Sequence, residues 1–304
     1  MPAPRSTSGR RPPPGPSGRA RRSGRGGGPP RSRRAGRARR RNTRSDFWAR
    51  VLSALPAIGL AIFLVVEGGL VFTLGLIALG ALCMHELFRM LDPEGPVRLA
   101  AFLGLAALLL AANYGSQFNV LLMAVAIVPV LFGLTLLQVR SGTVGMAITL
   151  LALWWIGLAL AHAVLLRRLP HGSGVIVDVL VGTFLGDTGA YLGGRTFGRR
   201  PLAPRLSPSK TVEGLLFGMV ASVLGVWLAS TYQDWLPGGK ALLLGLGVAV
   251  AAPVGDLFES YIKRDAGAKD TGRVFGAHGG ALDRLDAVLF TAVTGYYIWN
   301  AMIG

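Results

Sequence analysis

The sequence predicts an all-α, polytopic integral membrane protein with about nine transmembrane helices and a disordered, arginine-rich N-terminal tail. Of its 304 residues, 51% are hydrophobic and only 15% are charged, whereas a soluble domain has about 25% charged residues. The mean hydropathy is +0.49. Apolar runs recur at the length of a bilayer-spanning helix, about 17–25 residues. The one cysteine, Cys83, excludes a disulfide-rich secreted scaffold.

Residues 1–45 differ in composition from the rest of the chain. They hold 15 of the 32 basic residues and no acid, so residues 46–304 carry 17 basic and 15 acidic groups. This tail is mainly Arg, Pro, Gly and Ser, which cannot bury enough apolar surface to offset the entropy of ordering. We expect a disordered segment that mainly sets topology. Anionic lipid headgroups are an alternative partner. Nucleic acid is less favoured because no aromatic residue is interleaved for base stacking.

Nine candidate helices follow the tail. They fall near residues 49–66, 68–84, 99–115, 118–137, 143–166, 174–192, 212–230, 240–262 and 281–303. Lys and Arg accumulate in cytoplasmic loops, so the tail places the N-terminus inside. Counting crossings from there leaves only Arg167, Arg168 and Lys240 outside. Glycine pairs four residues apart, Gly182/Gly186 and Gly189/Gly193, suit close helix packing, and such pairs permit a homodimer without requiring one.

A first cluster of polar residues begins in the sixth apolar segment. Asp187 lies where a carboxylate is costly unless it faces a polar cavity or partner, so we expect it to point inward. The basic loop that follows ends in Lys210, with Ser207, Ser209 and Thr211 beside the start of the next helix. Hydroxyls, a lysine and free backbone N–H groups at a helix N-terminus form a phosphate site. The alternative is a basic cytoplasmic loop in which Thr211 only caps the helix.

A second, denser cluster occupies the last two apolar segments and their connection. Acid, hydroxyl and base share one face of the helix end at Asp256, Glu259 or Ser260, and Lys263. Asp283 and Asp286 share a face at the start of the last helix. Between them lie Lys269, Asp270 and His278. Oxygen ligands of this kind suit Mg²⁺ shared with substrate phosphates. The alternative is a salt-bridge network in which Arg284 pairs with Asp270 or Asp286.

Other polar residues are expected to be structural. His85 and Glu86 end the second apolar segment and offer too few ligands for a metal site. His162 is expected to be a packed or hydrogen-bonded histidine. Asp178 is ambiguous and stays outside the predicted site.

The second cluster resembles the signature of a known family. SYIKR at residues 260–264, Lys269-Asp270, and HGGALDRLD at residues 278–286 are similar to the signature of the phosphatidate cytidylyltransferases, also called CDP-diacylglycerol synthases. DTGAY at residues 187–191 and LSPSKTVEG at residues 206–214 look like the same family. The resemblance covers roughly residues 180–290 and leaves the arginine-rich tail outside.

The resemblance implies a membrane enzyme that uses CTP and phosphatidate to make CDP-diacylglycerol and pyrophosphate, with Mg²⁺ and a second, monovalent cation such as K⁺. Carried over by position, the metal carboxylates are Asp256 and Asp283, supported by Asp270 and Asp286. Lys263, Lys269 and His278 complete the expected catalytic set. The candidates for binding substrate phosphates are Ser207, Lys210, Thr211, Arg264, Arg284 and Asp187.

These inferences divide the chain into a cytoplasmic tail (1–45), N-terminal transmembrane helices (46–170) and a C-terminal transmembrane catalytic region (171–304). The expected location is a bacterial inner membrane, with the N-terminus and active site cytoplasmic. Two alternatives stay open: cytidylyl transfer to another lipid phosphate, such as an isoprenoid ether lipid, and a cation-coupled transporter. The transporter is less favoured because nearly all polar residues lie in the second half of the chain.

Overall fold

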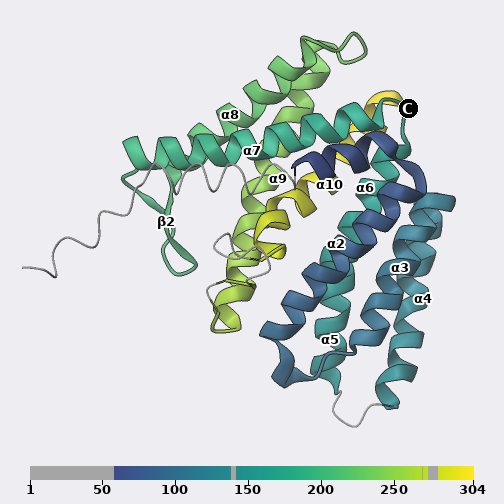
Figure 1. Ribbon diagram of the computed structural model, residues 1–304. Helices are drawn as coiled ribbons and strands as arrows, with labels where there is room; N and C mark the ends of the chain where they lie inside the picture. The colour runs from purple at the N-terminus through teal and green to yellow at the C-terminus, as the bar shows by residue number, and fades with distance from the viewer. Residues whose placement is uncertain (1–57, 138–141, 269, 273–279) are drawn as a thin grey trace, which may run out of the picture. The chain divides into compact units, whose positions relative to one another are not determined.

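A computed structural model describes residues 58–137, 142–268, 270–272 and 280–304 (Figure 1). The predicted tail, residues 1–45, lies outside the described residues. The helices are an apolar helix at Ile58–Glu67, α2 (Gly69–Met90), η1 (Asp92–Glu94), α3 (Arg98–Tyr114), α4 (Gln117–Leu136), α5 (Thr143–Ala152), η2 (Leu153–Gly157), α6 (Leu158–Arg168), α7 (Gly172–Phe197), α8 (Val212–Ser230), α9 (Gly238–Asp265) and α10 (Leu282–Ile303). Two short strands, β1 (Pro201–Ala203) and β2 (Ser207–Thr211), join α7 to α8.

The described helices confirm the helical membrane class. Each of the nine predicted apolar segments contains a helix within the described residues. Six of the described helical stretches are long and apolar enough to cross a bilayer, counting α5, η2 and α6 as one. Nine crossings, and a division between residues 170 and 171, stay predictions.

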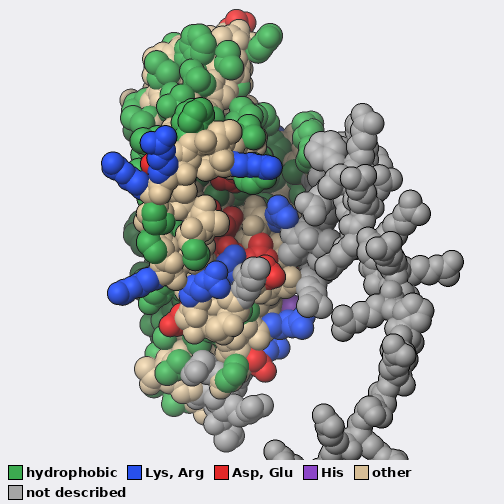
Figure 2. All heavy atoms as spheres, turned by 90° about the vertical axis from the view of Figure 1, so that its left-hand side faces the viewer, with side chains coloured by type: hydrophobic (Ala, Val, Ile, Leu, Met, Phe, Trp, Pro, Cys, Tyr) green, Lys and Arg blue, Asp and Glu red, His purple; other side chains and the backbone are tan. Residues whose placement is uncertain are grey.

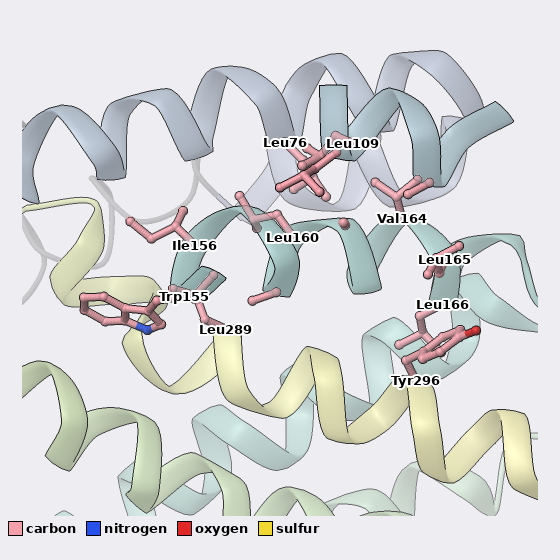
Figure 3. Packing of buried hydrophobic residues seen from close by; sticks show 14 of the residues in the cluster. Leu76, Leu109, Trp155, Ile156, Leu160, Val164, Leu165, Leu166, Leu289 and Tyr296 are labelled. Carbon is pink, nitrogen blue, oxygen red and sulfur yellow. The ribbon is translucent and has the colours of Figure 1, made fainter. Parts of the chain in front are cut away.

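Helix α6 joins the first half of the chain to the last helix. Its side chains, such as Leu160 and Leu166, are 4% and 1% exposed and lie between α2 and α3 on one side and α10 on the other (Figure 3). One apolar cluster includes residues of α2, α3, α4, α6, α7, α9 and α10. The N-terminal helices therefore pack against the helix that carries Asp283 in its first turn.

Helices α7 and α8 approach each other closely along the predicted glycine pairs. A Cβ atom at Gly182, Gly186, Gly189 or Gly193 would lie 2.4 to 3.3 Å from side chains of α8. Real Cβ atoms do not tolerate the shorter of these separations, so only glycine allows the observed packing. The prediction of close helix packing at these glycines is confirmed.

The basic segment after α7 is more ordered than the sequence predicts. Strands β1 and β2 pair antiparallel. Just before β1, the backbone N–H of Arg199 donates a hydrogen bond to the Glu213 carboxylate (3.0 Å). Between β1 and β2, the carbonyl of Leu206 accepts a hydrogen bond from Arg264 Nε (3.1 Å). A segment rich in Pro and Arg, without apolar alternation, lacks the usual strand signal. The expected all-α fold therefore needs this small hairpin added.

The three basic residues predicted to lie outside bind the ends of helices. Arg167 and Arg168 donate to backbone carbonyls at the ends of the Ile58–Glu67 helix and α3, at 2.7 and 2.6 Å. Lys240 Nζ donates to a carbonyl at the end of α10, at 2.7 Å. Basic side chains commonly satisfy the last carbonyls of a helix. These hydrogen bonds give Arg167, Arg168 and Lys240 a structural role at the end of the bundle opposite to Asp283.

Replacing Gly218 of α8 by alanine should destabilise the protein. The new Cβ would lie 2.8 Å from the Gly186 carbonyl oxygen and 2.8 Å from the Ala190 Cβ, so α7 and α8 would have to separate. Overpacking of this kind costs about 1–3 kcal/mol, measurable as a lower thermal unfolding midpoint in detergent. Gly133→Ala is the matched control, because nothing lies within 4 Å of its added Cβ. Equal midpoints for both variants would contradict this packing.

Candidate active site

Helices α7, α8 and α9 and strand β2 enclose a cavity of about 400 Å³. Asp187 of α7, Lys210 and Thr211 of β2, and Asp256 of α9 all line it. Lys210 and Asp256 form an ion pair, with their side chains 25% and 35% exposed. Figure 2 shows acidic side chains recessed in a hollow with Lys and Arg side chains around it. The structure therefore brings together four residues that the sequence places up to 69 positions apart.

The local structure explains how two of these side chains are placed. Asp187 lines the cavity from α7, and its side chain is also exposed at the surface. The Thr211 hydroxyl accepts a hydrogen bond from the Gly214 N–H (3.1 Å) and caps α8. Thr211 thus has the capping role that the sequence left open, and it also lines the cavity.

A second charged cluster joins α9 to α10. Lys263 Nζ lies 2.5 Å from Glu259 Oε2 and 3.0 Å from Asp283 Oδ1. Glu259 is 1% exposed, so Lys263 compensates a buried carboxylate. Asp283 Oδ2 accepts a hydrogen bond from the backbone N–H of Gly280 (2.7 Å). One ammonium therefore lies between carboxylates of two helices.

The two clusters are in electrostatic contact through Asp286. Asp286 of α10 lies within electrostatic reach of Asp256 and Asp187 of the first cluster and of Lys263 of the second. The charges of both clusters therefore act within one site.

Gly255 allows α9 and α10 to approach each other closely at this site. A Cβ atom at Gly255 would lie 2.5 Å from the carbonyl oxygen of Asp286, so the backbones of α9 and α10 meet beside Asp256. Close approach of two helices at a glycine thus places acids of different helices next to each other.

The remaining predicted residues have different positions. Arg264, Asp270 and Arg284 are exposed, and Arg264 binds the hairpin turn. Ser207 lies on β2 but does not line the cavity, whereas Ser209 does. Lys269 and His278 lie outside the described residues.

The acids suit a metal ion that shares its ligands with a substrate. Within the described ranges, no three His, Cys, Asp or Glu side chains are grouped closely enough to hold a metal ion alone. Mg²⁺ usually binds one or two carboxylates together with water and substrate phosphates. Asp256 and Asp286, whose negative charges oppose each other, fit that mode and not an all-protein cage.

Sequence reasoning missed one buried acid beside the site. Glu86 of α2 is 2% exposed, and its Oε2 accepts hydrogen bonds from the Leu282 N–H (3.0 Å) and the Thr271 hydroxyl (3.4 Å). From the sequence, Glu86 was expected only to end a helix. A carboxylate inside an apolar helix, the signal that identified Asp187, also applies to Glu86.

Two other polar residues agree with their predicted roles. His162 is hydrogen-bonded, with Nδ1 2.7 Å from the Leu158 carbonyl and Nε2 3.1 Å from the Tyr297 hydroxyl. Asp178 accepts a hydrogen bond from Gln233 (2.8 Å) and does not line the cavity. Neither contributes to the candidate site.

Comparison with known proteins gives a consistent result. The model of the cytidylyltransferase family matches residues 48–302. A phosphatidate cytidylyltransferase of Bacillus subtilis is 34% identical over 268 residues, which cover 83% of this chain and 97% of that protein. One of Synechocystis is 32% identical over 82% of this chain and 94% of its own length. One of Helicobacter pylori is 45% identical over 125 residues, 40% of this chain and 46% of that protein.

Removing Lys263 should strongly destabilise the protein. Lys263→Met leaves the buried Glu259 without its counter-charge, and breaking a buried pair from one side costs about 3–5 kcal/mol. We expect a lower unfolding midpoint in detergent, and partial recovery when Glu259→Gln is added, because the second change removes the uncompensated charge. Additive losses in the double variant, or an unchanged midpoint for Lys263→Met, would contradict the pairing.

Proposed function

Since this chain belongs to the cytidylyltransferase family, we propose that it transfers the cytidylyl group of CTP to phosphatidate, giving CDP-diacylglycerol and pyrophosphate. The observation that carries the proposal is the convergence of Lys210 with Asp256, and of Lys263 with Asp283, at one end of the helix bundle. The relatives matched over more than nine-tenths of their own length bear the name of this activity.

The reaction needs charge neutralisation more than a strong base. A phosphate monoester is already anionic near neutral pH, since its second pKa is about 6. An oxygen of phosphatidate attacks the α-phosphorus of CTP, the new P–O bond forms, and the bond to the β-phosphate oxygen breaks as pyrophosphate leaves. Two anions must therefore approach each other. Lys210 and Lys263 supply fixed positive charge where that repulsion arises.

The acids have a different proposed role. Asp256 and Asp283 would hold Mg²⁺, with Asp286 in support, because Asp286 is near enough to Asp256 for their charges to interact. When bound, the ion supplies further charge neutralisation for the phosphates. Asp270 as a supporting acid, and a second, monovalent cation such as K⁺, remain predictions from the resemblance. Arg264 and Arg284, both exposed, are proposed to reach phosphate groups of the substrates.

The proposed orientation places this end of the bundle in the cytoplasm of a bacterial cell, at the inner membrane. Its support is the distribution of basic residues and the cytoplasmic supply of CTP. Phosphatidate would then enter from the inner leaflet with its acyl chains in lipid. Binding of residues 1–45 to anionic lipid headgroups, and a homodimer, belong to the same set of predictions.

The direct test is to supply the purified protein in detergent with CTP, phosphatidate and Mg²⁺ and to identify the products by mass spectrometry. We expect CDP-diacylglycerol and pyrophosphate in equal amounts, and neither when Mg²⁺ is chelated. Absence of both products across a range of lipids and cations would overturn the proposal. Transfer to an isoprenoid ether lipid phosphate but not to phosphatidate would replace the acceptor.

Asp283→Asn should remove most of the turnover while the fold persists. The change keeps an acceptor oxygen for the Gly280 N–H but loses the negative charge that faces Lys263. Removing one electrostatic contact at a reacting centre typically costs about 10²–10³-fold in rate. Asp234→Asn is the matched control, because Asp234 is exposed and follows the end of α8 opposite to the end that Thr211 caps. Near-normal turnover of Asp283→Asn would exclude Asp283 from the metal site.

A further inference from the structure

Among the described acids of the N-terminal helices, Glu86 is the one that the structure places beside the candidate site. It lies in the last turn of α2 and is 2% exposed. A carboxylate removed from water to this degree needs hydrogen-bond donors around it. Its neighbour His85 is exposed, so Glu86 faces the protein interior while His85 faces the surface.

The donors come from both sides of the chain segment between α9 and α10. Glu86 Oε2 accepts hydrogen bonds from the Thr271 hydroxyl (3.4 Å) on one side and the Leu282 N–H (3.0 Å) on the other. A Cβ atom at Gly272 would lie 2.4 Å from Glu86 Oε1, and one at Gly280 would lie 2.4 Å from Oε2. Glycine at both positions therefore lets the backbone close around this carboxylate.

The same two stretches of backbone bind Asp283. The Thr271 N–H donates to its carboxylate at 3.2 Å, and the Gly280 N–H at 2.7 Å. Asp283 in turn binds Lys263. Glu86 and Asp283 thus both bind the backbone at the two ends of the connection between α9 and α10. Of the two acids, only Glu86 belongs to the N-terminal helices.

One oxygen of Glu86 is left over. Oε1 is buried and has no hydrogen-bond partner among the described residues. Buried polar atoms without partners are uncommon, and each one calls for an explanation.

We propose that Glu86 is a positioning residue for the transfer reaction: it fixes the start of α10 and the residues after α9, and so holds Asp283 and Lys263 in their working arrangement. This inference rests on the proposed function. Glu86 itself touches neither substrate. Glu86 should therefore affect kcat and not KM, because it sets the geometry of Asp283 and Lys263 and not the affinity for a substrate.

The first experiment compares Glu86→Ala, Glu86→Gln and the control His85→Ala in kcat, in KM for CTP and in unfolding midpoint. For Glu86→Ala we expect kcat to fall about 10²-fold, the effect of a misplacement of about 1 Å, with KM changed by less than about threefold. Glu86→Gln keeps an acceptor for the Leu282 N–H, so it should recover at least about tenfold of the lost rate. His85→Ala should match the wild type.

A second variant keeps the test decisive if Glu86→Ala folds poorly. Gly272→Ala pushes on Glu86 Oε1 and should lower kcat in the wild type, but much less in a Glu86→Asp background, whose shorter side chain leaves room for the added methyl group. Such non-additivity is the signature of direct coupling. An unchanged kcat for Glu86→Ala, no rescue by Gln, or equal losses from Gly272→Ala in the wild-type and Glu86→Asp backgrounds would overturn the role of Glu86 alone. A wild-type protein that makes no CDP-diacylglycerol would instead overturn the proposed function, and this inference with it.

Discussion

Charge compensation on helix α9 is the constraint on which the site depends. This helix carries Asp256, Glu259 and Lys263 at the end of an otherwise apolar stretch. Leaving a charge unpaired in such surroundings is expensive. Asp256 is paired with Lys210 of the hairpin, and Lys263 lies between Glu259 and Asp283 of α10. The pairs with Lys210 and Asp283 join α9 to two different neighbours, β2 and α10, so the charges that suit the chemistry also determine which elements meet.

Small residues make these pairings geometrically available. Glycines on α7 let α8 approach, and Gly255 lets α10 approach α9 beside Asp286. The resulting site brings Asp286 within electrostatic reach of Asp256 and Asp187. Substrate phosphates add more negative charge. A cation that neutralises both is therefore a physical requirement of the proposed reaction.

The sequence predicted those features that leave a local signal. Apolar runs indicated the helices, and an acid within such a run identified Asp187 as a cavity residue. The hairpin after α7 had no strand pattern, since Pro and Arg dominate that segment. Glu86 was missed for another reason. Its meaning depends on Thr271 and Leu282, nearly 200 positions away, and a helix end offered a sufficient local explanation.

The central claim is that these paired charges perform cytidylyl transfer, and label partition tests it most directly. The protein in phosphatidate-containing vesicles is given CTP radiolabelled at the α-phosphorus or, in parallel, at the γ-phosphorus. The account predicts α-label in the lipid extract and γ-label only in water. It also predicts about 10²-fold slower transfer by a folded Lys210→Met variant. No α-label in lipid, or a Lys210→Met variant as fast as the wild type, would contradict the account.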